Sequence, residues 1–236
     1  MKIAVIGAAG FVGSAIAKAV KGNPNDELIK VFKNDDATAL LDMADVTIHA
    51  ANPSKRFRAN SHPDRDFIET VDKTRKLIAC AKDAKLILIS SFSCRTQLGT
   101  AYGKNRRECE VDVLAAGGTV IRLGPMFGGD RTQDTLHDIL SNKNVYVSEK
   151  SRYAYVDVTW AGEKILEFVD AKSGIYEIGA RNDVSLGELR DIFESSSHFS
   201  GFDDTQIPDD AGDGPDAKLV IEYARKELRR LDEWKF

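Results

Sequence analysis

The chain of 236 residues is 42% hydrophobic and 30% charged, the balance of a soluble globular protein, which excludes disorder as an overall description. Its 33 lysines and arginines against 37 acidic residues give a net charge of −4, so we expect no basic surface for nucleic acid or for a membrane. No apolar run approaches the roughly 20 residues that cross a bilayer, and the N-terminal apolar stretch is too short for a signal peptide.

The first 124 residues alternate between two hydrophobic periods. Continuous apolar runs, typical of strands buried on both faces of a parallel sheet, occur at 2–6, 28–32, 46–50, 86–89 and 119–123. Helical spacing predicts helices at 11–22, 37–43, 63–81 and 104–115. The third of these helices should bury an apolar face that includes Phe67 and Ile68. Strand alternating with helix predicts the α/β class, with a doubly wound parallel sheet.

The regular alternation of strand and helix patterns ends after Gly124. Short strand-like pieces are expected at 145–147, 153–156 and 175–178, and helices at 132–140, 158–169, 185–195 and 217–231. Residues 203–216 hold six aspartates, two prolines and two glycines, a composition that predicts a surface loop. We therefore expect a dinucleotide-binding domain over 1–124, followed by segments over 125–236 that complete the sheet and form a small substrate-binding part.

A glycine-spaced loop joins the first strand directly to the first helix. Glycines at positions 7, 10 and 13 allow a tight turn, close approach of the backbone to a pyrophosphate, and close packing of helix on strand. The free N–H groups at the start of the helix can then hold phosphates. This context predicts a dinucleotide site, and its residues are Gly7, Ala9, Gly10, Phe11, Val12 and Gly13.

Several motifs in order resemble the extended short-chain dehydrogenase/reductase family, in particular its NAD-dependent epimerase/dehydratase type. They are the G-x-x-G-x-x-G loop, the D-V-T-I-H-A-A strand at 45–51, Ile89-Ser90-Ser91, Tyr102-Gly103-Lys104-Asn105-Arg106 with Glu110, the segment at 121–128, Tyr155-Val156-Asp157-Val158, and the segment at 174–179. The resemblance covers nearly the whole chain and implies an NAD(P)-binding Rossmann fold.

The same resemblance implies three catalytic residues. Tyr102 takes the position of the acid–base tyrosine, Arg106 that of the lysine four residues later, and Ser91 that of the residue that polarises the substrate oxygen. A phenol needs a nearby cation to act as a base near neutral pH, and residues i and i+4 of a helix share a face. Tyr102 and Arg106 are expected to contact the cofactor as well.

Two departures from the family pattern concern this constellation. Position 106 is arginine, which keeps the charge but is planar and bulkier than a lysine ammonium. Only eleven positions separate Ser91 from Tyr102, so the loop between them is short. Lys104 is an alternative cation. It lies two residues after Tyr102, however, and residues i and i+2 of a helix do not share a face. Ser93 is an alternative to Ser91 and a candidate for substrate binding.

The choice of cofactor depends on the end of the second strand. An acid there accepts from the ribose of NAD, whereas a base favours the 2′-phosphate of NADP. Lys33 follows the strand, with Asp35 and Asp36 two and three places later, so the sequence slightly favours NADP over NAD. The small residues after the third strand, Ala50, Ala51 and Asn52, are expected to let the backbone approach the cofactor.

Arg131 and Arg152 are candidates for the phosphates of a nucleotide sugar, the substrate class that the resemblance implies. Neither the three cysteines nor the four histidines have the spacing of metal ligands, and His49 is interpreted as a hydrogen-bonded strand-end residue. An odd cysteine count without a secretory signal favours a reducing compartment, the cytoplasm.

We thus expect an NAD(P)-dependent epimerase or oxidoreductase acting on a sugar carbinol or carbonyl. The alternatives are a small-molecule carbonyl reductase and an NAD(P)-binding regulator with a degenerate catalytic motif. Monomer and homodimer both stay open.

Overall fold

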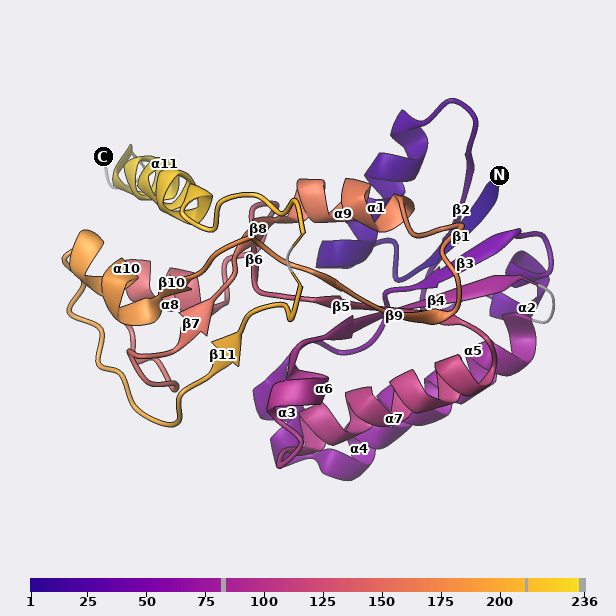
Figure 1. Cartoon of the computed structure of the whole chain (residues 1–236), viewed down its shortest axis with the longest axis horizontal. Coiled ribbons are helices and arrows are strands. Elements are labelled where there is room, and N and C mark those ends of the chain that lie inside the picture. The colour runs from indigo at the N-terminus through magenta and orange to yellow at the C-terminus, as the bar shows by residue number, and fades with distance from the viewer. Residues whose placement is uncertain (82–83, 211, 234–236) are drawn as a thin grey trace. The chain divides into compact units, whose positions relative to one another are not determined.

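The computed structural model describes residues 1–81, 84–210 and 212–233. The chain forms two compact units (Figure 1). The first consists of Met1–Leu123 and Thr159–Ile178, and the second of Gly124–Val158 and Gly179–Phe236. No helix in these described ranges is both long and apolar enough to span a bilayer.

A six-stranded parallel sheet is the centre of the first unit. Its strand order is β2-β1-β3-β4-β5-β9, and the strands are β1 (Lys2–Ile6), β2 (Glu27–Val31), β3 (Val46–His49), β4 (Lys85–Ser91), β5 (Thr119–Leu123) and β9 (Gly174–Ile178). The middle strands β3 and β5 are buried along their whole length, as expected for apolar runs covered on both faces. The predicted α/β class and parallel sheet are confirmed, and a segment from beyond residue 124 completes the sheet as β9.

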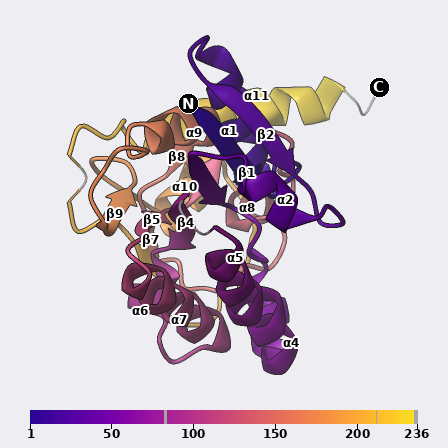
Figure 2. The same cartoon turned by 90° about the vertical axis from the view of Figure 1, so that its right-hand side faces the viewer.

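Helices cover both faces of this sheet. They are α1 (Phe11–Gly22), α2 (Ala37–Leu41), α3 (Arg56–Ser61), α4 (Pro63–Phe67), α5 (Lys73–Ala81), α6 (Ser93–Thr96), α7 (Ala101–Ala115) and α9 (Val158–Leu166). Figures 1 and 2 show α1 and α9 on one side of the strands and α4, α5 and α7 on the other. Gly162 of α9 lies so close to α1 that a Cβ there would be 2.7 Å from the carbonyl carbon of Ala15.

The expected helix at 63–81 is correct in extent, and its predicted apolar face is correct at Val71 and Ala81 but wrong at Phe67 and Ile68. A π-helical turn, Ile68–Asp72, separates α4 from α5. Because the wider turn rotates the helix face, Phe67 and Ile68 are 37% and 59% exposed, while Val71 is buried. The helix α3 before it was not predicted.

The second unit contains short strands and three helices. The strands β6 (Met126–Phe127) and β8 (Val156–Asp157) pair with each other, and β10 (Val184–Ser185), β7 (Arg152–Tyr153) and β11 (Thr205–Gln206) form a second small sheet. The helices α8 (Thr135–Leu140), α10 (Leu186–Ile192) and α11 (Leu219–Glu233) pack with them around one apolar core that includes Phe127, Leu136, Tyr153, Leu186 and Val220.

Three expectations for the second unit are wrong. The strand expected at 153–156 is interrupted, since β7 ends at Tyr153 and β8 begins at Val156. Residues 145–147 form no strand, only an isolated bridge between Val145 and Phe199. The acidic segment 203–216 is not wholly a surface loop, because Asp204 and Gln206 are each 1% exposed. The Asp204 carboxylate accepts hydrogen bonds from the Tyr153 hydroxyl at 2.8 Å and from the Gln206 amide at 2.6 Å, which compensates for part of the cost of its burial.

Candidate functional site

The loop between β1 and α1 requires glycine at two positions. Gly7 has a φ of +86°, in the left-handed region that favours glycine, and its N–H donates to the Val31 carbonyl at 3.0 Å. A Cβ at Gly13 would lie 2.0 Å from the Gly7 carbonyl oxygen. The Gly10 N–H donates back to that same oxygen at 2.8 Å. The result is a tight cradle with the N-terminus of a 12-residue helix at its end.

The segment after β3 lies against this cradle. A Cβ at Gly7 would meet the Ala51 Cα at 2.9 Å and the Ala50 carbonyl oxygen at 3.0 Å. Both polar atoms of the Asn52 amide are buried and have no hydrogen-bond partner of good geometry, although the amide lies near enough to the His49 ring to act on its pKa. Because buried amides normally find partners, this orphaned side chain marks a place where a polar ligand fits. The structure therefore brings the predicted Ala50, Ala51 and Asn52 to the glycine loop.

The end of β2 carries charges of both signs. The Asp35 carboxylate accepts from the Phe32 N–H at 2.8 Å, and the Asp36 carboxylate accepts from the Thr38 N–H at 3.1 Å as the N-cap of α2. Both acids are thus fixed on backbone donors, whereas the Lys33 side chain is exposed. An exposed cation beside two anchored carboxylates is compatible with a ribose or a 2′-phosphate.

Ser91, Ser93 and Tyr102 lie on elements that touch through their backbones. Ser91 ends β4, and its hydroxyl accepts from the Ser93 N–H at 3.3 Å. The Ser93 hydroxyl is buried without a partner. A Cβ at Gly103 would be 2.2 Å from the Gln97 carbonyl oxygen and 2.7 Å from that of Ser93, so α7 begins in direct contact with α6. Helix α7 starts three residues earlier than expected, which places Tyr102 in its first turn.

Arg106 contacts Tyr102 as the helical spacing predicts. Its guanidinium lies 4.3 Å from the centre of the Tyr102 ring, and the arginine is 2% exposed. The same group donates to the Thr70 hydroxyl at 3.0 Å and to the Pro53 carbonyl, and it lies 3.6 Å from the Asp66 carboxylate. Arg106 is therefore already held by protein acceptors. Lys104 is exposed on another side of α7, as its spacing predicts.

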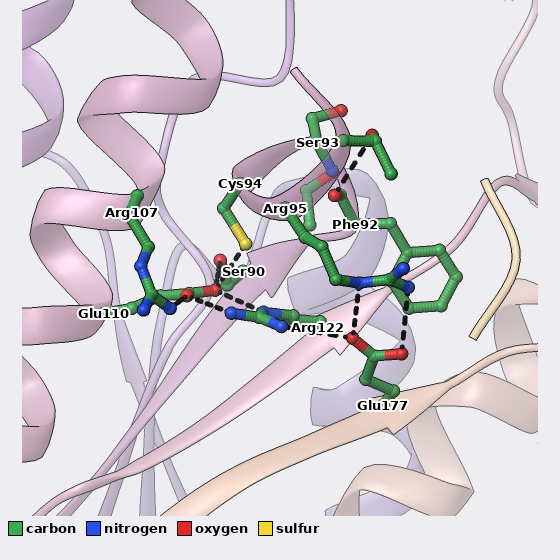
Figure 3. Close-up of polar contacts among 11 residues, drawn as sticks. Ser90, Phe92, Ser93, Cys94, Arg95, Arg107, Glu110, Arg122 and Glu177 are labelled. Carbon is green, nitrogen blue, oxygen red and sulfur yellow. Dashed lines mark hydrogen bonds and ion pairs between the residues drawn. The ribbon is translucent and has the colours of Figure 1, made fainter. Parts of the chain in front are cut away.

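A buried ion-pair network lies beside these residues (Figure 3). Arg122 of β5 donates twice to Glu110 of α7, at 2.9 and 2.7 Å, and once to Glu177 of β9, at 3.2 Å. Arg95 of α6 donates to both oxygens of Glu177 at 3.2 Å. Figure 3 shows Arg122 between the two carboxylates. The network fixes α6 and α7 on the carboxyl ends of the strands.

The network also determines the protonation state of the Cys94 thiol. The Cys94 thiol and the Ser90 hydroxyl both donate to Glu110 at 2.7 Å. Burial would raise the pKa of Glu110, but hydrogen bonds from Arg122, Cys94 and Ser90 outweigh it and lower that pKa. Burial and the Glu110 charge raise the pKa of Cys94 to about 12. The thiol therefore stays protonated and is a hydrogen-bond donor rather than a nucleophile.

Sequence reasoning missed part of this network. Glu110, Arg122 and Glu177 occur in the quoted motifs without an assigned role, and Arg95 lies outside them. Only the placement of β9 beside β5 brings Glu177 to Arg122 and Arg95.

Arg131 and Arg152 belong to the second unit, and Ser93 to the first. Arg152 is 53% exposed at its side chain and pairs with Asp183 at 2.5 Å. Substrate binding by these three residues stays a prediction.

The described residues contain no group of three or more His, Cys, Asp or Glu side chains that could hold a metal ion. His49 is fully buried, with one ring nitrogen 3.2 Å from the Thr74 hydroxyl and the other accepting from the Ala51 N–H at 3.3 Å. The interpretation of His49 as a hydrogen-bonded strand-end residue is confirmed.

Comparison with known proteins finds no matching family model and no matching curated protein. Solved structures do match. A dTDP-4-dehydrorhamnose reductase ortholog from Clostridium acetobutylicum aligns with a TM-score of 0.77 at 17% identity, over 97% of this chain and 100% of that one. The fold is that of the nucleotide-sugar reductases and epimerases.

Two epimerase structures support the same statement. UDP-glucose 4-epimerase from Thermotoga maritima aligns with a TM-score of 0.72 at 16% identity, over 97% of this chain and 100% of that one. UDP-glucuronic acid 4-epimerase from Bacillus cereus, in complex with UDP-glucuronic acid and NAD, aligns with a TM-score of 0.72 at 18% identity, over 94% and 93% of the two chains. The resemblance stated from the motifs is thus confirmed for the fold, and at these identities the fold is what the likeness establishes.

Proposed function

We propose that the chain is an NAD(P)-dependent oxidoreductase or epimerase that acts on a sugar carbinol or carbonyl, with a nucleotide sugar as substrate. The observation that carries this proposal is the glycine cradle, with Ala50, Ala51 and the orphaned Asn52 amide beside it. The substrate class is supported by the fold, since similar structures are described with UDP-sugars and NAD.

The residues present fit a dinucleotide. A Cβ at Gly13 would fill the cradle, and the buried Asn52 amide offers both a donor and an acceptor without protein partners. The loop residues Gly7, Ala9, Gly10, Phe11, Val12 and Gly13 would hold the phosphates, and Ala50, Ala51 and Asn52 the adjoining part of the cofactor. When bound, the nicotinamide accepts hydride from a carbinol or returns it to a carbonyl.

Tyr102 is the group proposed to move the proton. Oxidation of a carbinol requires loss of its hydroxyl proton, and the phenol of Tyr102 can accept or return that proton. The Arg106 guanidinium lies 4.3 Å from the centre of the Tyr102 ring, so a cation is in contact with the proposed acid–base group. Ser91 is proposed to hold the substrate oxygen by a hydrogen bond, with Ser93, whose buried hydroxyl has no partner, as the alternative.

The test of this function is Tyr102→Phe. The variant keeps the ring that packs on Arg106 and removes only the hydroxyl, so fold and cofactor affinity should be unchanged while turnover falls by about 10²–10⁴-fold. Stopped-flow absorbance of NADPH and NADH with a panel of nucleotide sugars measures turnover, and Tyr146→Phe, at a residue that is 77% exposed, is the matched control. A Tyr102→Phe protein that turns over like the wild type would eliminate the catalytic assignment.

A regulator that binds the cofactor without turnover is the second candidate, because Arg106 is held by Asp66, Thr70 and the Pro53 carbonyl. For a regulator, dinucleotide affinity is measurable, but no sugar in the panel changes the absorbance of the bound cofactor. The wild-type protein therefore separates the two functions before any variant is made.

We further propose that NADP is preferred over NAD, because the exposed Lys33 side chain can meet the 2′-phosphate. Lys33→Glu should reverse the preference by about 1–3 kcal/mol, the value of a charged hydrogen bond. Calorimetric titration with both cofactors measures it, and Lys30→Glu, at another exposed lysine on β2, is the control. Equal wild-type affinities for NAD and NADP would contradict this preference.

A further inference from the structure

Lys73 reaches the same strand end as the predicted cofactor residues, although no motif contains it. It is the first residue of α5, directly after the π-helical turn. Its ammonium donates to the Ala51 carbonyl oxygen at 2.5 Å. Helix α5 thus brings a cation to the segment that lies against the glycine loop.

The charge of Lys73 has no close counter-ion. Within the described ranges of the chain, no carboxylate lies within 4.0 Å of its ammonium. The acid one turn before it, Glu69, is bound to Arg65 at 2.9 Å. Burial lowers the pKa of Lys73, and the charge of Arg106 lowers it further. A half-buried ammonium with a single carbonyl acceptor is unfavourable by itself and would be stabilised by an anion.

The surroundings of Lys73 indicate which anion this is. The Ala51 Cα would be 2.9 Å from a Cβ at Gly7, so the residue that Lys73 binds also touches the phosphate cradle. The next residue, Asn52, carries the buried amide without partners. An ammonium, an amide and a glycine loop at one sheet edge are the groups that hold a diphosphate.

Arg106 does not supply this charge. Its guanidinium faces the Asp66 carboxylate at 3.6 Å and donates to the Thr70 hydroxyl at 3.0 Å. Both side chains of the pair are nearly inaccessible, at 3% and 5% exposure. The positive charge of Arg106 is therefore compensated within the protein, whereas that of Lys73 is not.

We propose that the Lys73 ammonium, together with the Asn52 amide, binds the diphosphate of the dinucleotide cofactor. Lys73 is then a binding residue on α5, outside the motifs quoted from the sequence. This inference rests on the proposed function, since it requires a dinucleotide in the glycine cradle.

The experiment is calorimetric titration of the full chain and of Lys73→Gln with NAD, NADP, ADP-ribose and adenosine. Loss of a charged hydrogen bond should weaken the three diphosphate ligands by about 10- to 100-fold and leave adenosine unchanged. Lys73→Arg should restore most of the affinity. Lys76→Gln, at an exposed lysine on the same helix, should bind like the wild type. The affinity of the wild type for NAD should also fall more steeply with added salt than that of Lys73→Gln.

The outcomes separate the inference from the proposed function. A wild-type protein that binds no dinucleotide overturns the proposed function. A wild-type protein that binds NAD or NADP, with Lys73→Gln matching Lys76→Gln, overturns the role of Lys73 alone. Equal weakening of adenosine and ADP-ribose, accompanied by a lower melting temperature of Lys73→Gln, would assign Lys73 a structural role and would also overturn the inference.

Discussion

Gly103 is a position where one added atom should disturb the geometry around Tyr102. It follows Tyr102 in the first turn of α7, and a Cβ there would be 2.2 Å from the Gln97 carbonyl oxygen. Because the obstacle is backbone, Gly103→Ala must push the start of α7 away from α6 by about 1 Å. The displacement moves Tyr102 relative to Ser91 and Ser93.

The magnitude follows from two opposing effects. Overpacking of this kind destabilises by about 1–3 kcal/mol, and the preference of a helix for alanine over glycine returns up to about 1 kcal/mol. We expect Gly103→Ala to lower the free energy of unfolding by about 1–2 kcal/mol. A catalytic group displaced by about 1 Å can lose about 10²-fold in kcat. Cofactor affinity should change much less than kcat, because the glycine loop between β1 and α1 is not displaced.

Urea unfolding, steady-state kcat and titration with cofactor together measure these effects. Gly99→Ala is the matched control, since a Cβ there meets nothing within 4 Å, and its stability should change by less than about 0.5 kcal/mol. If Gly103→Ala matches Gly99→Ala in both stability and kcat, the contact between α6 and α7 does not position Tyr102, and the reasoning is refuted.

Three further predictions concern the first unit. Glu110→Gln should lower the free energy of unfolding by about 3–5 kcal/mol in urea titration, because it removes a buried carboxylate that Arg122 binds twice. The control is Glu108→Gln on the same helix, where the carboxylate forms an exposed ion pair with Arg75, and it should lower the free energy of unfolding by less than about 1 kcal/mol. Gly13→Ala should abolish dinucleotide binding in calorimetry, since its Cβ would be 2.0 Å from the Gly7 carbonyl oxygen. The control is Gly22→Ala in the same helix, where a Cβ has no heavy atom within 4 Å, and this variant should bind the dinucleotide like the wild type. Burial, and then the charges of Lys73 and Arg106, lower the pKa of His49 from 6.5 to about 3. Between pH 6.5 and pH 3 the His49 side chain is therefore protonated in the unfolded chain but neutral in the folded chain. Stability should therefore fall as the pH decreases from 6.5 toward 3, by up to about 5 kcal/mol, and His49→Gln should lack this component in urea titrations across that range; an unchanged pH profile would contradict the assignment.

The sequence predicts the first unit well because its inner strands, such as β3 and β5, are buried on both faces. Such strands are continuous apolar runs, and the runs at 2–6 and 119–123 match β1 and β5 to the residue. The position of β9 in the sheet is not predicted by the sequence. Its apolar pattern predicts a strand, but only tertiary packing places it beside β5 and so delivers Glu177 to Arg122.

The errors have local physical causes. The π-helical turn at Ile68–Asp72 has no composition signal, and it rotates the apolar face on which the prediction for Phe67 and Ile68 relied. The acidic segment 203–216 was interpreted from composition alone. Composition does not show that the Tyr153 hydroxyl and the Gln206 amide donate to Asp204, which helps to stabilise this carboxylate in a buried position.

Arginine at position 106 shows how the site departs from the pattern that its motifs resemble. A guanidinium has five donors in a plane, so it can face Asp66, Thr70 and the Pro53 carbonyl while its face lies on Tyr102, a set that a single ammonium could not satisfy. The arginine thereby ties α7 to α4, to the π-helical turn and to the segment after β3. That arrangement uses its charge within the protein and leaves the Lys73 ammonium, 2.5 Å from the Ala51 carbonyl, as the half-buried charge without a close carboxylate at the cofactor edge. Under the proposed function, Arg106 of α7 contacts the tyrosine ring, and Lys73 of α5 is the residue proposed to bind the cofactor.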